Sequence, residues 1–170
     1  NKKEYIVIGI PSTGIMPAKM YAKKINITYN QAIIKNKKIN RTFILSAEER
    51  DIASKQKYIY KKEAIQNKHV IILDDSIVRG ITMKNIVHNL WSYGAKEVHI
   101  RIISPTITNI CKYGIDIPTH NELIAYNRPL SELNDYFGST SLIYLKKEDM
   151  LSNNFFNNKK LCGSCFDLEW

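Results

Sequence analysis

No stretch of this 170-residue sequence approaches the ~20 consecutive apolar residues that a membrane-spanning helix needs. A secretory signal and internal repeats are also missing. We therefore expect one globular domain without a membrane partner, located in the cytoplasm or, as an alternative, in an organelle. The sequence begins with Asn1 rather than Met and enters an apolar run at Tyr5. This start predicts that an N-terminal part is missing, together with any targeting signal.

Acidic residues are few, with 16 Asp and Glu against 25 Lys and Arg, and the net charge is +9. Such a charge invites the hypothesis of a nucleic-acid partner. The lysines are, however, spread among Asn and Ile residues and do not form one basic block with interleaved aromatic residues. A nucleic-acid partner is thus not expected from the charge, which equally suits a ligand rich in phosphate.

Apolar runs alternate with segments of helical length along most of the chain. Strands are predicted at residues 5–10, 31–35, 70–73, 98–103 and 139–144, and helices at residues 15–24, 83–93, 119–124 and 129–137. Strands separated by helices are typical of parallel βαβ units. About 25 residues after Lys35 show little periodicity, which is typical of a lid loop. A helix over residues 47–57 is the alternative interpretation.

The most informative stretch is an apolar run at residues 70–73, followed by Asp74 and Asp75 and then by a loop that leads into a helical pattern near Met83. This order places two carboxylates at the carboxyl end of a buried parallel strand, where open α/β sheets bind ligands. The loop brings backbone N–H groups to a helix N-terminus, which favours a phosphate. Carboxylates accept hydrogen bonds from sugar hydroxyls or approach Mg²⁺. The stretch therefore predicts a site for a sugar phosphate.

Residues 74–80 resemble the phosphoribosyl pyrophosphate (PRPP) fingerprint of the type I phosphoribosyltransferases. The longer form with residues 94–101 resembles the amidophosphoribosyltransferases, and five further blocks match in order, at residues 8–11, 34–36, 41–44, 113–116 and 122–125. The resemblance implies an α/β fold with a mainly parallel twisted sheet flanked by helices and a long flexible lid loop. It implies a phosphoribosyltransferase domain over residues 1–151, whose N-terminal part is missing, and a linker and cysteine-containing tail over residues 152–170.

The resemblance also implies a reaction, the first step of purine synthesis. Ammonia, taken from glutamine in the full enzyme, attacks C1 of PRPP in the presence of Mg²⁺ and gives 5-phosphoribosylamine and pyrophosphate. The glutaminase domain that supplies ammonia in the family is absent from this sequence, which could at most use free ammonia. Family members are usually homotetramers, so a homo-oligomer is expected.

Site residues carry over from the family by position. Asp74 and Asp75 would hold the ribose and, with Thr13, Mg²⁺; the 5′-phosphate would bind at Ser76, Val78, Arg79, Gly80, Ile81 and Thr82. Pyrophosphate would bind at Thr13 and Gly14, beneath a lid that contributes Lys35, Asn36, Thr42 and two catalytic cations, Arg41 and Lys57. An ordinary N-capped turn at residues 11–14 and a solvated lysine-rich loop are the structural alternatives.

Cys111, Cys162 and Cys165 coincide with cysteines that ligate a [4Fe–4S] cluster in many relatives. Four thiolates are normal for such a cluster, so the fourth would lie outside this chain. Three unligated thiols are the alternative interpretation.

Several positions depart from the family pattern and put efficient catalysis in question. Ser12 replaces an acidic residue, Ile81 a Thr, Met83 a Ser, Lys37 an Arg and Asn40 a Gly. Three alternative functions stay open at this point: a non-catalytic PRPP-binding regulator with affinity for nucleic acid, an inactive diverged fragment, and a phosphoribosyltransferase that uses a nucleobase.

Overall fold

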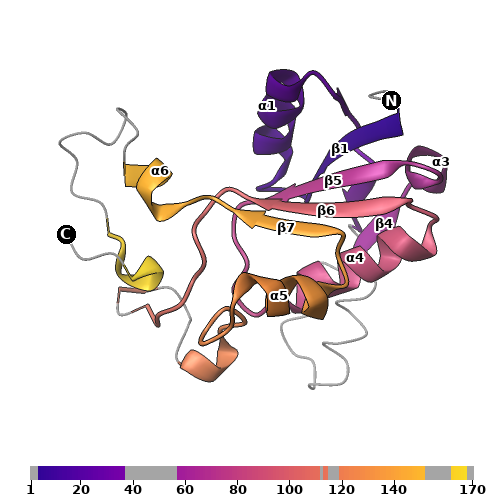
Figure 1. Cartoon of the computed structure of the whole chain (residues 1–170). Helices are drawn as coiled ribbons and strands as arrows, with labels where there is room; N and C mark the ends of the chain where they lie inside the picture. Colours follow the sequence, from indigo (N-terminus) through magenta and orange to yellow (C-terminus); the bar gives the residue numbers. More distant parts are fainter. Residues whose placement is uncertain (1–3, 37–56, 112, 115–118, 152–161, 168–170) are drawn as a thin grey trace.

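The computed structural model describes residues 4–36, 57–111, 113–114, 119–151 and 162–167. Its centre is a five-stranded sheet in the order β2-β1-β5-β6-β7, in which every neighbouring pair is parallel (Figure 1). The strands are β1 (Tyr5–Gly9), β2 (Thr28–Tyr29), β5 (His69–Asp74), β6 (Glu97–Ile102) and β7 (Ser141–Tyr144). The predicted mainly parallel α/β fold is confirmed.

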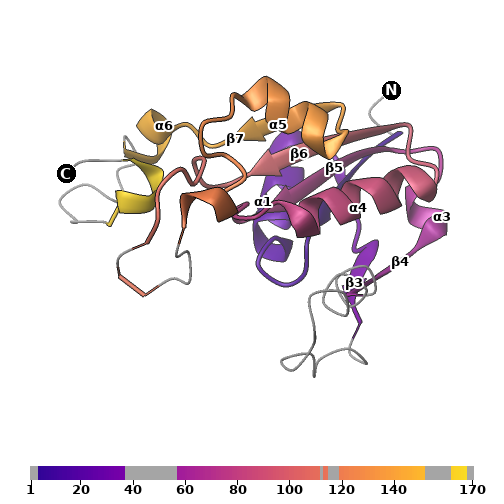
Figure 2. The same cartoon turned by 90° about the horizontal axis from the view of Figure 1, so that it is seen from below.

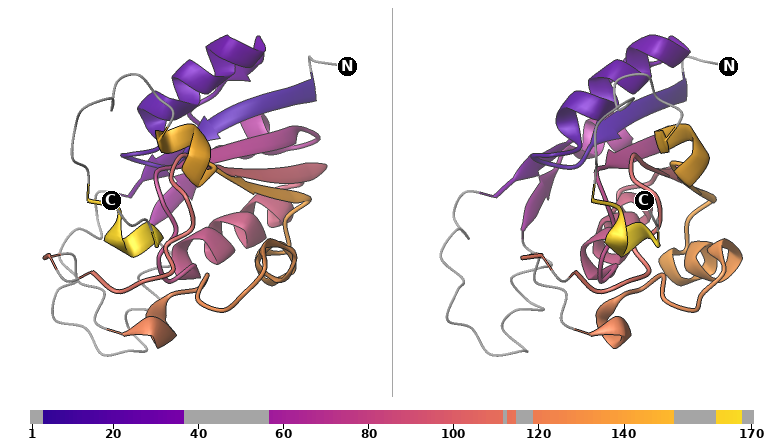
Figure 3. Two further views of the ribbon diagram at one scale, coloured as in Figure 1. Left: turned by 60° about the vertical axis from the view of Figure 1, so that its left-hand side comes forward. Right: turned by 90° about the vertical axis from the view of Figure 1, so that its left-hand side faces the viewer.

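Helices cover both faces of the sheet. Helix α1 (Ile15–Ile25) lies on one face, and α4 (Ile81–Ser92) and α5 (Leu130–Phe137) lie on the other (Figure 3). Successive strand residues point to opposite faces. Accordingly, Val7 packs with α1, whereas its neighbour Ile8 joins the core under α4. This two-sided burial explains why the central strands are continuous apolar runs rather than alternating ones.

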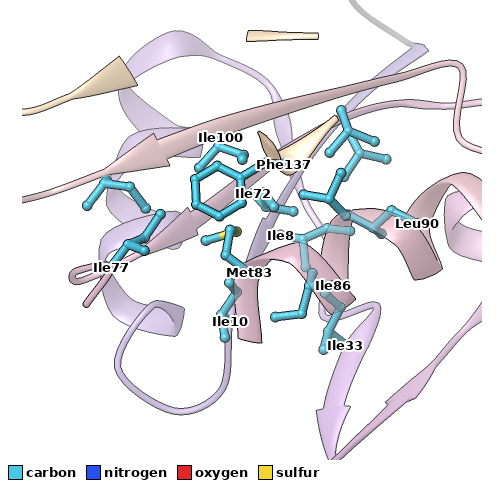
Figure 4. Packing of buried hydrophobic residues seen from close by; sticks show 14 of the residues in the cluster. Ile8, Ile10, Ile33, Ile72, Ile77, Met83, Ile86, Leu90, Ile100 and Phe137 are labelled. Carbon is cyan, nitrogen blue, oxygen red and sulfur yellow. The ribbon is translucent and has the colours of Figure 1, made fainter. Parts of the chain in front are cut away.

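The larger core lies between the sheet and the α4–α5 layer. Ile8 and Ile72 from the sheet meet Met83 and Leu90 from α4 and Phe137 from α5 (Figure 4). All five side chains are at most 3% exposed. This packing holds the beginning of α4 close to the carboxyl ends of β1 and β5.

One predicted strand lies outside the parallel sheet. β3 (Ile33–Lys35) pairs antiparallel with β4 (Tyr58–Tyr60), set apart from the main sheet (Figure 2), and α3 (Lys62–Ile65) follows. The sequence did not indicate β4, because three residues are too few to show an alternation. Neither β2 nor this hairpin was predicted. Residues 37–56, which include most of the predicted lid and the alternative helix, lie outside the described residues.

The predicted helix at residues 119–124 is instead a single 3-10 turn, η3 (His120–Glu122). Leu123 leaves the turn in an extended conformation and is buried, as are the next two residues. Two short elements follow β7, namely α6 (Lys147–Leu151) and the 3-10 turn η4 (Ser164–Phe166). Within the described part of the chain, no helix has the length and apolar character required to span a membrane.

Candidate functional site

The site lies between β1 and β5, where the order in which successive strands are added to the parallel sheet reverses. From β1 the chain passes through α1 to β2 on one side, and from β5 it passes through α4 to β6 on the other. The loops after β1 and β5 therefore diverge and leave a crevice at the carboxyl ends of the two strands. A cavity of about 730 Å³ lies there, lined by Ile10, Pro11, Thr13, Lys57, Tyr58 and residues 74–83.

The acidic pair stands at the end of β5, as predicted. The Oδ1 atom of Asp74 accepts a hydrogen bond from the Asp75 N–H at 3.0 Å and lies 3.4 Å from the donating Thr13 hydroxyl. Burial of Asp74, together with the adjacent Asp75, raises the pKa of Asp74 to about 7 from 3.8. The negative charge of Asp74 is thus costly, and a cation or hydroxyl donor in the cavity would stabilise it.

The loop after β1 is held tightly against β5. The Ile10 N–H donates to the Leu73 carbonyl at 2.9 Å, and the Gly14 N–H donates to the Ile10 carbonyl at 2.9 Å. A Cβ atom on Gly14 would lie 2.3 Å from the Leu73 carbonyl oxygen, so only glycine fits this position. The Pro11–Ser12 peptide bond in this loop is cis.

Thr13, in the same loop, faces the acidic pair. Gly14 occupies the N-cap position of α1, and no side chain of the described residues caps that helix. The Thr13 hydroxyl is directed to Asp74 instead. The structure thus does not show the alternative of an N-capped turn, and the ligand loop stays a prediction.

Residues 76–82, which we call the phosphate loop, lead from the acidic pair into α4. Gly80 is the N-cap of α4 with φ of 77°, and no side chain among the described residues caps the helix. The first N–H groups of a helix have no acceptor within the helix, and the helix dipole adds positive charge there. Ile77 is 4% exposed and anchors the loop in the core. The loop can therefore present backbone N–H groups to an anion.

Two departures from the family pattern in this region differ in their surroundings. Ile81 is 51% exposed at the start of α4, whereas Met83 is 2% exposed and packs in the main core near Phe137 (Figure 4). The sequence predicts that Met83 removes a hydroxyl donor from the phosphate loop, and this stays a prediction. The structure shows that Met83 both lines the cavity and packs in the core, so this position places an apolar side chain at the cavity wall.

Arg79 lines the cavity, but its guanidinium is already engaged. Its Nε donates to Glu122 Oε2 at 2.7 Å, and its Nη2 also contacts this oxygen. The predicted phosphate contact of Arg79 therefore has a competing carboxylate partner.

Of the predicted lid residues, the structure brings Lys57 to the cavity, while Lys35 is exposed on β3 and Asn36 pairs with the hairpin backbone. Within the described residues, neither Lys35 nor Asn36 lines the cavity. Arg41 and Thr42 lie outside the described residues. Gly14 is buried against the Leu73 carbonyl and is not among the described residues that line the cavity.

Sequence reasoning missed Tyr58, whose hydroxyl lies 3.5 Å from the Pro11 carbonyl oxygen. Burial, and secondarily the charge of Asp74, raise the pKa of Tyr58 to about 12. Ile10 also lines the cavity, although the sequence indicated it only as the end of the first strand. Pro11, Ile77 and Met83 line the cavity within the two loops that the sequence predicted to bind the ligand.

The C-terminal turn brings the cysteines into one region. The Thr108 and Asn109 N–H groups donate to the Cys165 carbonyl, and Cys111 and Cys165 pack around the same small apolar cluster as Val78. Burial raises the pKa of the Cys165 thiol, and the nearby Cys111 and Cys162 add to this. Cys111, Cys162 and Cys165 form no disulfide bond in the described part of the chain. Over the described ranges, no group of three or more His, Cys, Asp or Glu side chains is arranged to hold a metal ion.

Comparison with known proteins agrees with this geometry. Residues 1–104 match the family model of the phosphoribosyl transferase domain. The chain is 38% identical over 162 residues to amidophosphoribosyltransferase 2 of Arabidopsis thaliana and 45% identical over 140 residues to the amidophosphoribosyltransferase of Pyrococcus horikoshii. These matches cover 95% and 82% of the chain, respectively, but only 29% and 31% of the relatives.

A solved structure of glutamine PRPP amidotransferase from B. subtilis, complexed with ADP and GMP, is similar with a TM-score of 0.77 and 37% identity. The match covers 95% of this chain and 35% of the B. subtilis chain. A second structure, described as the allosteric regulatory enzyme of purine biosynthesis, gives a TM-score of 0.82 at 36% identity, with 95% of this chain and 36% of that chain covered. The chain thus spans about a third of the length of these relatives.

Proposed function

This chain belongs to the phosphoribosyltransferase family, and we propose that its cavity binds PRPP for transfer of the phosphoribosyl group to ammonia. The proposal rests on one observation. The Asp74–Asp75 pair, the loop after β1 at residues 11–14 (the β1 loop) and the phosphate loop all line the same cavity. The similarity to amidophosphoribosyltransferases over 95% of the chain supports ammonia as the acceptor. The products would be 5-phosphoribosylamine and pyrophosphate, in the first step of purine synthesis.

In this proposal the phosphate loop binds the 5′-phosphate and the β1 loop binds the pyrophosphate group. The carboxylates of Asp74 and Asp75 accept hydrogen bonds from the two ribose hydroxyls, which orients C1 toward the acceptor. A C1–N bond forms as the C1–O bond to pyrophosphate breaks, and the nitrogen releases a proton to solvent. Negative charge near the ribose favours the positive charge that develops on the sugar.

The cavity also suits Mg²⁺. Oxygen atoms from two carboxylates and the Thr13 hydroxyl lie near one another at the ends of β1 and β5. Burial, followed by the adjacent Asp75, raises the pKa of Asp74, so a cation in the cavity would stabilise the charged form of Asp74. Mg²⁺ is commonly held by one or two carboxylates together with substrate phosphates. When bound, the ion would neutralise charge on the departing pyrophosphate. Asp74, Asp75 and Thr13 are the residues that would hold it.

The test is PRPP-dependent release of pyrophosphate by the purified chain with Mg²⁺, measured with and without ammonia. We expect ammonia to stimulate release and Asp74→Asn to reduce it by about 100-fold or more, since the mutation removes a charge at the reacting sugar. Asp135→Asn, an exposed site on α5, is the matched control. PRPP binding without turnover would favour the regulatory alternative, and no PRPP binding would overturn the proposal.

We also propose that Cys111, Cys162 and Cys165 supply three ligands of a [4Fe–4S] cluster, with the fourth thiolate outside this chain. The packing of Cys111 and Cys165 around one apolar cluster supports this, although the three thiols are not arranged as a metal site in the described residues. Four thiolates complete such a cluster. Anaerobic reconstitution followed by iron and sulfide analysis tests it. A cluster would be supported if the chain bound iron and sulfide stoichiometrically and Cys111→Ser lost both. Iron binding that is unchanged in Cys111→Ser would contradict the proposal.

A further inference from the structure

The phosphate loop is attached to a segment that the proposed reaction does not use. Glu122, in η3, accepts hydrogen bonds from Arg79 of the phosphate loop through Oε2 and from the Thr119 hydroxyl through Oε1, the latter at 3.2 Å. The Arg79 and Glu122 side chains are 43% and 34% exposed. Both carboxylate oxygens of Glu122 are thus occupied, one by the loop and one by its own segment, which orients the carboxylate toward the loop.

Two further contacts join the same two segments. The Ile124 N–H donates to the Val78 carbonyl at 2.9 Å. A Cβ atom on Gly80 would lie 3.1 Å from Cγ1 of Ile124, so the backbone at Gly80 runs directly against this side chain. Val78, Arg79 and Gly80 are consecutive, and each contacts residues 122–124. The middle of the phosphate loop is therefore bound along its length to the segment after η3.

This attachment bears on how the loop binds an anion. The guanidinium of Arg79 is paired with Glu122, and Ile81 has no hydroxyl, so anion binding by this loop depends on its backbone N–H groups together with the Ser76 and Thr82 hydroxyls. Backbone donors bind well only when they converge on one point, and a loop that fluctuates loses this convergence. An anchor outside the cavity can therefore determine affinity without touching the ligand.

We propose that Glu122 is a positioning residue, which holds the phosphate loop through Arg79 in the conformation that binds the 5′-phosphate. The proposal rests on the proposed function for the identity of the ligand. It predicts a selective effect, because the β1 loop at residues 11–14 is held separately by Leu73. Loss of Glu122 should therefore weaken binding at the phosphate loop and spare binding of pyrophosphate.

The experiment compares the chain with Glu122→Gln and with Glu132→Gln, a matched change at an exposed position on α5. Hydrogen exchange of the unliganded protein reports the phosphate loop, and calorimetry reports ribose 5-phosphate and, with Mg²⁺, pyrophosphate. For Glu122→Gln we expect about fivefold faster exchange at residues 76–82 and unchanged exchange in β5. We expect about fivefold weaker ribose 5-phosphate binding with pyrophosphate affinity unchanged.

Arg79→Gln should reproduce both effects, and the double variant should be no worse than either single one, since all three lose the same pair. Unchanged exchange at residues 76–82 would overturn the inference. Tighter ribose 5-phosphate binding by Glu122→Gln would also overturn it, because Glu122 would then only mask the charge of Arg79. If exchange responds but the unmodified chain binds no ribose 5-phosphate, the proposed ligand fails while the positioning of the loop by Glu122 stands.

Discussion

The carboxyl group of Asp74 lies in an environment that differs strongly from water. Its pKa is raised to about 7, first by burial and then by the hydrogen bond and charge of Asp75. Between about pH 4 and pH 7 the folded chain therefore keeps a proton that the unfolded chain has released. The native state binds more protons in this window, so the free energy of unfolding falls as the pH rises through it and becomes level above about pH 8.

The first prediction concerns Asp74→Asn in the absence of Mg²⁺. The substitution removes the buried charge and should raise the free energy of unfolding at pH 8 by about 1–2 kcal/mol, with little change at pH 4. Urea unfolding at several pH values measures the difference. Asp135→Asn, at an exposed site, should keep the pH dependence of the unmodified chain. If the free energy of unfolding of Asp74→Asn still fell steeply from pH 4 to pH 7, Asp74 would not be the group that causes this pH dependence.

The second prediction separates the two substituted positions at the start of α4. Met83→Ser should lower the free energy of unfolding by about 2–4 kcal/mol, because it leaves a cavity in the core and buries a hydroxyl. Ile81→Thr, at an exposed position, should change it by at most about 0.5 kcal/mol. Equal effects of the two substitutions in chemical denaturation would show that Met83 is not a core residue.

At the scale of elements, the geometry of the site depends on how closely the loop after β1 packs against β1 and β5. A Cβ on Gly14 would lie 2.3 Å from the Leu73 carbonyl oxygen in β5, and a Cβ on Gly9 would lie 2.4 Å from the carbonyl oxygen of Gly14 in the loop itself. Because these atoms belong to the backbone, they cannot move aside as a side chain could. The position of Thr13 beside Asp74 therefore depends on two residues that carry no functional group.

The third prediction is that Gly14→Ala displaces the β1 loop from β5. We expect a loss of about 1–3 kcal/mol in the free energy of unfolding and weaker pyrophosphate binding, since the methyl group forces the loop away from the Leu73 carbonyl. Thermal unfolding and calorimetry measure the two effects. Ser12→Ala, in the same loop but exposed, should leave stability within about 0.5 kcal/mol. Unchanged pyrophosphate affinity in Gly14→Ala would contradict a binding role for the loop.

Elements with a strong apolar pattern were predicted from the sequence to within two residues at most ends, including β5 and α4. The prediction failed for β2, β4 and the turn η3, which are only two or three residues long. Such short elements form because a neighbouring strand or loop supplies their hydrogen bonds. Their own residues carry too little pattern to reveal them.

At the scale of the whole molecule, the net charge of +9 raises the question whether the chain binds nucleic acid. In the described part of the chain, the cavity is lined by two acidic residues, Asp74 and Asp75, and by two basic ones, Lys57 and Arg79. A phosphate-rich small molecule with Mg²⁺ suits this mixture better than a polyanion does.

The fourth prediction is that the chain does not shift a short DNA duplex at micromolar concentration in about 0.15 M salt, because its lysines are dispersed rather than clustered. Electrophoretic mobility measures this, with Asp74→Asn as a variant that should behave identically. A shift that weakens steeply between about 0.05 and 0.2 M salt would support the regulatory alternative.

The fold class, the acidic pair and the loop that follows it could be predicted from the amino-acid sequence, because apolar periodicity and a contiguous motif are properties of neighbouring residues. The contacts between distant segments could not: Thr13 with Asp74, Tyr58 with Pro11, and Glu122 with Arg79 are seen only in the folded chain. The folded chain also shows that Met83 packs in the core. Contacts between residues far apart in the chain depend on the order and direction of the strands, and that order is set when the sheet assembles.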